Sequence, residues 1–413
     1  MTRPAMLWAR VRESLWFVPS VLTAGATLLA FSTVWLDRHA VLGGRTYWFV
    51  FASGAEGARG VLATIAGSII TVTGVVFSIT IVVLQLASSQ FTPRVLRSFT
   101  ENRANQLVLG VFIGTFTYSL LVLRTVRSET DGAELFVPAL SVTIALALAL
   151  VSIGFLIFFI NHIARSIQAE VIIDRVTADA VEVVDALFPA TIGEPASELT
   201  RLHTIPPEAD VGWSPILAPS AGYLQAVDEE AIMALAEKHD VALKMESRVG
   251  EFLIEGDPVA TVSRPLPRDA AGAIQSAFQL GPERTRHQDV ERGLIELSDI
   301  AVRALSPGIN DPTTACVCID RLTQILTLLS ERRFPDTVRM DKAGRVRLIA
   351  RLPTFEGLVK LAYSQIRHFG VSNPAIASRL NESLTRLAAR VQPVQRAAVE
   401  SELAELIRPR TAR

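Results

Sequence analysis

Long apolar stretches alternate with short polar ones over the first part of the chain. Four stretches contain no Asp, Glu, Lys, Arg or His, and they cover residues 15–36, 61–87, 107–123 and 135–160. Each comes close to or exceeds the roughly 17–25 residues that an α-helix needs to cross a hydrocarbon core of about 30 Å. The pattern therefore predicts a domain of four transmembrane helices over residues 1–165.

The first apolar stretch also has features of a cleaved leader, because arginines precede it and the small residues Ala24-Gly25-Ala26 lie within it. Mostly apolar residues continue beyond that point, so an uncleaved span is expected. The arginines of the connecting segments indicate the orientation of the spans. With the N-terminus inside, seven arginines lie in inner segments and five in outer ones. Both termini are therefore expected in the cytoplasm.

After the fourth stretch, the pattern changes to the shorter periodic segments of a cytosolic α+β region. Residues 166–212 are expected to extend the fourth helix and then to form a linker. Residues 213–265 alternate apolar and polar positions between glycine turns, which predicts a small β-rich module. Residues 266–413 are predicted to form a mostly helical domain. Its expected elements are helices at 270–280, 283–305, 312–333, 355–369, 374–392 and 394–408, and a strand at 345–351.

Charge and cysteine content exclude several classes of protein. The net charge is −1, with an excess of arginine in the predicted membrane domain and an excess of acidic residues after it. An acidic cytosolic portion without a basic stripe argues against a nucleic-acid partner. Cys316 and Cys318 are the only cysteines. Positions i and i+2 point to different faces of a helix, so neither a disulfide framework nor a metal site is expected.

The second apolar stretch carries polar residues at helical spacing. Steps of three and four residues define a single stripe that is polar at five of its seven positions and consists of Ser68, Thr71, Val75, Ser78, Val82, Gln85 and Ser89. Such a face is poorly matched to lipid and is expected to meet other helices or water. Either it packs against helices, or it lines an aqueous path built by several subunits. The small residues expected to support helix contacts are Gly67, Gly74, Gly110 and Gly114.

The stripe leads into a predicted inner membrane boundary at Gln90, Pro93 and Arg94. Pro93 is expected to end the helix, and Arg94 is expected to lie among the inner lipid headgroups. Membrane lipids are thus expected partners. A homo-oligomer is also expected, because one stripe per subunit encloses a pore only when several subunits meet. The lack of ionisable groups in all four stretches disfavours an active transporter.

The segment ALSPGINDPTTA, residues 304–315, separates two predicted helices. Ser306 is expected to end the first helix because a proline follows it, with Gly308 in the left-handed conformation just beyond. Asp311 is predicted to be the N-cap of the second helix, with Pro312 in its first position. These assignments explain part of the segment by structure alone.

Three polar residues of the same segment, Asn310, Thr313 and Thr314, leave two interpretations open. Their side chains can satisfy the backbone of the turn itself. Alternatively, together with the first amides of the following helix, they form a cradle for a small anionic or polar ligand in the cytosolic domain.

The ionisable residues outside this segment do not indicate a catalytic site. The preceding helix carries a charged stripe that is expected to be a solvated face, consisting of Arg292, Glu296, Asp299 and Arg303. His287 and Glu291, with Asp289 between them, are expected to make only a surface contact. No hydrolase, metalloprotease, phosphate-loop or dinucleotide-binding motif occurs in the chain, so neither an enzyme nor a cofactor is expected.

Three segments together resemble a known family. They are SPGINDPTTA, RTRHQDVERGLIELSDIAVRA before it, and GVVFSITIVVLQLASSQFTPR in the second apolar stretch. The chain resembles, over nearly its whole length, the bacterial integral membrane family catalogued as domain of unknown function 2254. This resemblance implies an inner-membrane protein with the layout described above. It implies no activity and no catalytic residues.

Two hypotheses for function follow. The first is an oligomeric, channel-like conduit for ions or small solutes, in which the cytosolic domain senses or gates. The second is a non-conducting, membrane-anchored module that binds a ligand or partner in the cytosol.

Overall fold

The computed structural model describes most of the chain, and it divides into two compact units, Met1–Gln168 and Ala169–Arg413. The described residues are 16–39, 54–90, 103–128, 135–166, 168–188, 212–285 and 288–407, with the side chains of 87–90 left aside.

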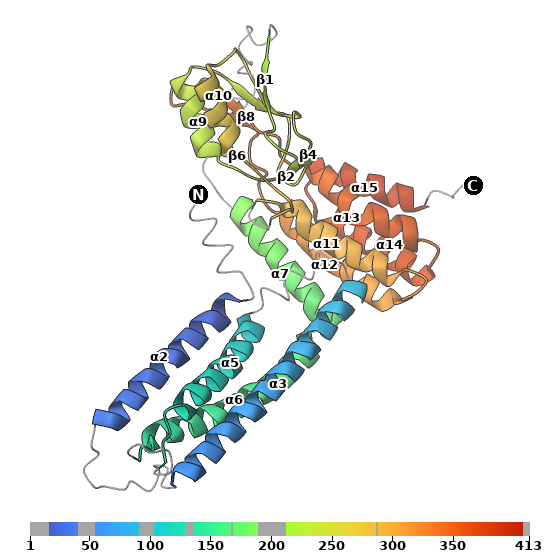
Figure 1. The fold of residues 1–413 in the computed structure, drawn as a ribbon. Coiled ribbons are helices and arrows are strands. Elements are labelled where there is room, and N and C mark those ends of the chain that lie inside the picture. The colour runs from blue at the N-terminus through green and yellow to red at the C-terminus, as the bar shows by residue number, and fades with distance from the viewer. Residues whose placement is uncertain are drawn as a thin grey trace. The chain divides into compact units, whose positions relative to one another are not determined.

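Four long apolar helices make up the first unit, as the hydrophobic pattern predicts. They are α2 (Phe17–His39), α3 (Ala55–Gln90), α5 (Arg103–Leu123) and α6 (Ala139–Ser166). All four are long and apolar enough to cross a membrane. The central helix is α5, which contacts each of the other three (Figure 1). The protein is therefore a multi-pass membrane protein with four candidate spans.

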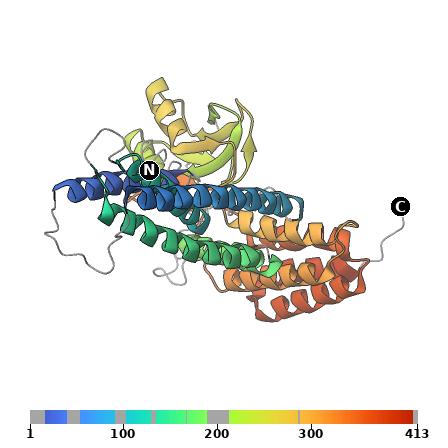
Figure 2. The ribbon, with the colours of Figure 1, turned by 60° about the horizontal axis from the view of Figure 1, so that its bottom comes forward.

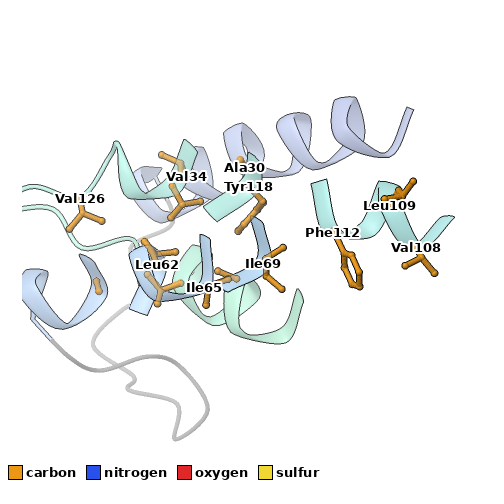
Figure 3. Close-up of a cluster of buried hydrophobic side chains, with 14 of the residues drawn as sticks. Ala30, Val34, Leu62, Ile65, Ile69, Val108, Leu109, Phe112, Tyr118 and Val126 are labelled. Carbon is orange, nitrogen blue, oxygen red and sulfur yellow. The ribbon is translucent and has the colours of Figure 1, made fainter. Parts of the chain in front are cut away.

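The apolar core of this unit forms around α5. Phe112 and Tyr118 of α5 are fully buried, and Leu62 and Ile69 of α3 and Ala30 of α2 belong to the same cluster (Figure 3). These residues come from three helices that are distant in the sequence. Their packing fixes which side of each helix faces inward.

Two glycines bring α2 and α5 into close contact. A Cβ atom at Gly110 would lie 2.5 Å from Cδ1 of Leu22, and one at Gly114 would lie 3.3 Å from Cβ of Ala26. Small residues four positions apart let two transmembrane helices approach closely. The expectation that Gly110 and Gly114 support a helix contact is therefore confirmed.

Exposed tryptophans mark both ends of α2. Trp16 is 62% exposed and Trp35 is 58% exposed. A helix rises 1.5 Å per residue, so the two lie about 28 Å apart along the helix axis. This separation is close to the hydrocarbon thickness of about 30 Å, and tryptophan favours the interfaces of a bilayer. The spacing fits a helix that spans the membrane with one tryptophan at each surface.

The second unit begins with α7 (Ala169–Leu187), which follows α6 after only two residues. The expectation of one helix running through both segments is wrong. The backbone N–H of Gln168 donates to the carbonyl of Arg165 at 3.1 Å, which tightens the chain just after α6. The two helices have different surroundings, because α6 is apolar all round whereas α7 buries one amphipathic face within the second unit.

Two small sheets form the β part of the second unit. The orders are β1-β5-β3-β8-β7 and β4-β2-β6, and only β3 and β8 run parallel among the described pairs. The strands are β1 (Ser214–Leu217), β2 (Gly222–Val227), β3 (Leu243–Met245), β4 (Phe252–Leu253), β5 (Pro258–Val262), β6 (Phe278–Gly281), β7 (Val338–Met340) and β8 (Val346–Ile349). Two helices, α9 (Glu229–Lys238) and α10 (Arg268–Ala277), contribute Ile232 and Ile274 to the core of these sheets.

One strand corrects the predicted boundaries. Residues 278–280 were expected to be helical, but they belong to β6, in which Phe278 pairs with Val227 of β2 and is buried in the sheet core. The reason is tertiary, because pairing with β2 outweighs the local preference for helix. The sheets also recruit β7 and β8 from much later in the chain.

Five further helices complete the second unit and lie side by side in both views (Figure 1, Figure 2). They are α11 (Val290–Ala304), α12 (Pro312–Ser330), α13 (Phe355–Gly370), α14 (Pro374–Arg390) and α15 (Pro393–Ile407). Among them, α11 contacts α7, α12 and α13. It begins at Val290 rather than at 283, because Asp289 accepts a hydrogen bond from the backbone N–H of Arg292 and caps the helix there.

Candidate functional site

One side of α3 is exposed and carries the polar stripe predicted from the sequence. We call it the α3 face, and its exposed residues include Gly60, Thr64, Gly67, Ser68, Thr71, Gly74, Ser78 and Gln85. The opposite side is buried, with Leu62, Ile69 and Val76 in the core, and α3 contacts α5 and α6. Within the described part of the first unit, Ser68, Thr71, Ser78 and Gln85 are therefore exposed and not buried in contacts between its helices.

The α3 face repeats every seven residues. One column consists of Gly60, Gly67 and Gly74, and a second consists of Thr64, Thr71, Ser78 and Gln85. A strict seven-residue repeat favours a left-handed crossing with another helix. A Cβ atom at any of the three glycines would meet no atom within 4 Å in the part of the chain that the structure describes. In contrast to Gly110 and Gly114, these glycines leave the backbone open on the surface of the subunit.

The threonine hydroxyls of the α3 face bond to their own helix. Thr64 Oγ1 donates to the carbonyl of Gly60 at 2.7 Å, and Thr71 Oγ1 donates to the carbonyl of Gly67 at 2.8 Å. Each hydroxyl oxygen keeps its capacity to accept a hydrogen bond from outside the subunit. The face thus carries no charge, and its polar groups alternate with the exposed Val75 and Val82.

The predicted inner boundary can be placed only in part. Ser89 and Gln90 belong to the last turn of α3, where the side chains are not described. Pro93 and Arg94 lie outside the described residues. Their assigned roles therefore stay predictions.

Some polar groups inside the first unit form hydrogen bonds between different helices. Asp37, near the end of α2, accepts hydrogen bonds from the backbone N–H groups of Leu140 at 3.0 Å and Ser141 at 2.9 Å. Tyr118 donates to the carbonyl of Ser141 at 3.1 Å and shares a hydrogen bond with Thr33 at 2.9 Å. A carboxylate is favourable at a helix N-terminus, so Asp37 caps α6 from another helix. Sequence analysis missed this cap because donor and acceptor are far apart in the chain.

The SPGINDP turn takes a different backbone path from the predicted one. Asn310 has a φ of 50° and occupies the left-handed region, which was expected for Gly308. The backbone N–H of Asn310 donates to the carbonyl of Ser306 at 2.9 Å, and that of Asp311 donates to the carbonyl of Ala304 at 2.8 Å. Asparagine tolerates this conformation better than most residues. These two hydrogen bonds turn the chain back toward the end of α11. The left-handed residue is therefore Asn310, directly before Asp311.

Asp311 caps α12, as predicted. Its Oδ1 accepts the backbone N–H of Thr314 at 3.1 Å, and its Oδ2 accepts the hydroxyl of Thr314 at 2.6 Å. The hydroxyl of Thr314, followed by the backbone N–H groups, holds the pKa of Asp311 below its ordinary value. Thr314 is used by the turn itself, while Asn310 and Thr313 are exposed. A carboxylate already occupies the start of α12, so a second anion there would be repelled.

The charged stripe on α11 is buried in its first half, so the expectation of a solvated face is wrong there. Arg292 is 9% exposed and Glu296 is 5% exposed. Nε of Arg292 lies 2.8 Å from Oε1 of Glu296, and Nη1 donates to the carbonyl of Arg284 at 2.6 Å. The second half, Asp299 and Arg303, is more open. Residues of α7 cover the first half, which the spacing of charges along α11 cannot reveal.

A second cluster of buried charges lies at the start of α11. Asp289 contacts Nε of Arg284 at 2.5 Å, and Glu291 contacts Arg248 at 2.7 Å. Gly250 has a φ of 91°, and a Cβ atom there would collide with the guanidinium of Arg284. Glu291 was expected to make a surface contact, but it is buried, and so is Asp289. The structure does not describe His287.

The described residues include no group of three or more His, Cys, Asp and Glu side chains that could hold a metal ion. Cys318 is buried and Cys316 is partly buried. Burial raises the pKa of both thiols. Both cysteines are therefore protonated near neutral pH, and neither has the character of a reactive thiolate.

Comparison with known proteins identifies the family. A family model described as "Predicted membrane protein (DUF2254)" matches residues 12–386. An uncharacterised protein of Mycobacterium bovis and one of Mycobacterium tuberculosis H37Rv are each 38% identical to this chain over 360 residues. The aligned region covers 85% of this chain and 68% of each relative. No solved structure gives a significant match.

Proposed function

The chain belongs to the DUF2254 family of predicted membrane proteins, and from that premise we propose that it assembles into an oligomeric, channel-like conduit for ions or small solutes. The bacterial inner membrane is its location, with both termini and the second unit in the cytoplasm, where the second unit senses or gates. The observation that carries this proposal is the α3 face, which is polar, uncharged and exposed along a helix long enough to span a membrane.

Lipid is a poor neighbour for the α3 face. Hydrocarbon offers no hydrogen-bond partner to Ser68, Ser78 or the open acceptor of Thr71, and burying an unsatisfied polar group is costly. Glycines along a transmembrane helix allow a second helix to come close. A second copy of α3 has the same seven-residue repeat, so the two faces can stay in contact along a left-handed crossing.

The two columns of the α3 face have different roles in this assembly. The column of Gly60, Gly67 and Gly74 packs against a neighbouring subunit, where the absence of side chains permits close contact. The column that begins at Thr64 and Thr71 faces the axis of the oligomer, where hydroxyl groups meet water. No ionisable side chain belongs to either column. The conduit is therefore passive and is not coupled to proton transfer.

The length of α3 places these residues at different depths. Arg59, whose Nη2 donates to the carbonyl of Val126 at 3.2 Å, marks the outer end. At 1.5 Å per residue, Thr71 lies about 18 Å, Ser78 about 28 Å and Gln85 about 39 Å along the helix from Arg59. Thr71 and Ser78 then lie within a hydrocarbon core of about 30 Å, whereas Gln85 lies at the inner mouth.

Conductance of the purified protein in planar bilayers tests the proposal. Ser78→Leu is expected to abolish conductance, because it places a bulky apolar side chain in the path. Ile79→Leu is the matched control, since Ile79 is the next residue, is exposed and lies away from both columns. Thr71→Val and Thr73→Val form a second matched pair, because both hydroxyls donate to their own helix but Thr73 is buried. A wild-type protein that is monomeric by mass photometry and never conducts refutes the proposal.

A second candidate function is a membrane-anchored module that binds a partner in the cytosol. The observation that favours it is the tip of the SPGINDP turn, which is exposed and includes the apolar Ile309 at 40% exposure. On this alternative, Thr313→Ala weakens binding of the partner, while Ser78→Leu changes nothing. Loss of activity in Ser78→Leu excludes this alternative.

A further inference from the structure

The first helix of the second unit, α7, is held firmly by two other helices. Its buried residues Ile173, Val176 and Val184 lie on the side that packs against α11 and α12. An ion pair also holds its exposed side, because Oδ1 of Asp174 lies 2.6 Å from Nη2 of Arg321 on α12. Asp185 of α7 forms a second ion pair with Arg332, which follows the end of α12. A displacement of α11 and α12 therefore displaces α7 as well.

The contact between α7 and α11 has no free space at Gly293. A Cβ atom at Gly293 would lie 2.5 Å from Cβ of Ala180 and 3.4 Å from its Cα. Real Cβ atoms do not approach this closely, so only glycine allows Ala180 to sit there. The buried pair of Arg292 and Glu296 lies beside this contact. We call the contact of Ala180 with Gly293 the α7–α11 joint.

The start of α11 contacts the β part of the second unit. Asp289, which caps α11, is paired with Arg284 and lies against the loop that contains Gly250. Glu291 of α11 is paired with Arg248 of the same loop. The start of α11 thus touches the β part of the second unit, and the following turns of α11 touch α7. A change in the position of that loop is transmitted along one rigid helix.

We propose that the α7–α11 joint is where the second unit controls the membrane conduit, an inference that rests on the proposed function. Only two residues separate α6 from α7, so the last Cα atom of α6 and the first of α7 are at most about 11 Å apart. A connector this short cannot absorb a large displacement of α7. Movement of α11 at the joint is therefore passed through α7 to the fourth membrane span.

A double-mutant cycle in the full-length protein tests the joint. Gly293→Ala adds a methyl group that collides with Ala180, and Ala180→Gly removes the atom that it meets. Flux through the reconstituted protein is expected to change at least about fivefold in G293A. It is expected to return to within about twofold of wild type in the double variant A180G/G293A. Gly272→Ala on α10, where a Cβ atom meets nothing within 4 Å in the described structure, is the matched control.

The outcomes separate the inference from the proposed function. A folded, oligomeric G293A protein with wild-type flux overturns the inference, and so does a double variant that stays as impaired as G293A. If G293A does not fold, the single variant A180G tests the inference, because it removes the methyl group of Ala180 from the same contact without causing a collision. An unchanged flux in A180G then overturns the inference. A wild-type protein without flux defeats the proposed function itself.

Discussion

Replacing Arg292 by methionine measures whether the charged pair on α11 is buried or solvated. The substitution removes the guanidinium that contacts Glu296 at 2.8 Å and the carbonyl of Arg284 at 2.6 Å. Glu296, only 5% exposed, then loses its partner. Leaving one member of a buried pair uncompensated costs about 3–5 kcal/mol, whereas an exposed pair at this spacing contributes about 0.3–0.5 kcal/mol. We expect the free energy of unfolding of the second unit to fall by about 3 kcal/mol.

Thermal unfolding of the full-length protein in detergent provides the assay. For a unit of this size, a loss of 3 kcal/mol lowers the melting temperature by about 6–12 °C. The double variant R292M/E296M removes both charges and is expected to regain most of the lost stability, since apolar side chains often replace a buried ion pair without cost. Arg303→Met, on the exposed half of the same helix, is the control and should change stability by less than about 0.5 kcal/mol.

Two results would refute the reasoning. A decrease of less than about 1 °C in R292M would match a solvated pair, as predicted from the spacing of charges alone. A double variant no more stable than R292M would show that the cost does not come from the uncompensated carboxylate of Glu296. The first result would mean that α7 does not cover this part of α11 in solution.

Three further predictions concern other parts of the structure. Gly110→Ala is expected to destabilise the first unit by about 1–3 kcal/mol, because the added methyl group collides with α2. Gly154→Ala is the control and should change the stability little, because its methyl group meets open space among the described residues. Calorimetric melting temperatures of the two variants test this difference. Asn310→Ala should lower the stability of the second unit by about 1 kcal/mol, because φ is 50° there and alanine disfavours the left-handed region. Asn310→Gly should not lower it. Equal melting temperatures of the two variants by circular dichroism would contradict this explanation. The pKa of Asp341 is lowered to about 2, first by the backbone N–H of Arg345 and then also by the Arg347 guanidinium. Because this folded-state pKa lies below the ordinary 3.8, the stabilisation is full above about pH 4 and is lost as the pH falls through about 2. Arg347→Met should therefore flatten the dependence of stability on pH between pH 4 and 2, and a curve as steep as that of wild type would argue against the contact.

The candidate site was predictable to different degrees at its different residues. Spacing alone placed Ser68, Thr71 and Ser78 on one side of a helix, and the structure leaves that side exposed. Spacing could not decide between a helix contact and an open face, because both use small polar residues. Gly60 precedes the apolar stretch and became part of the repeat only once α3 was seen to begin at Ala55. Thr64 lies within the stretch, seven residues before Thr71, and was overlooked.

Asp37 illustrates a residue that no local pattern could identify. It lies just outside an apolar stretch, where an acidic residue is expected for solubility at a membrane surface. Its partners Leu140 and Ser141 follow more than a hundred positions later. Only the packing of α2 beside α5 and α6 brings the carboxylate to the N-terminus of α6.

The sequence by itself determined the number of membrane spans and several of the helix ends. A bilayer demands a long uninterrupted apolar segment, and a cap such as Asp311 acts within a few residues, so both leave a local pattern. Only the tertiary structure decided that the α3 face stays uncovered, that Arg292 and Glu296 are buried, and that residues 278–281 pair as a strand. Periodicity places a residue on a side of its own helix, whereas burial depends on what distant segments pack against that side.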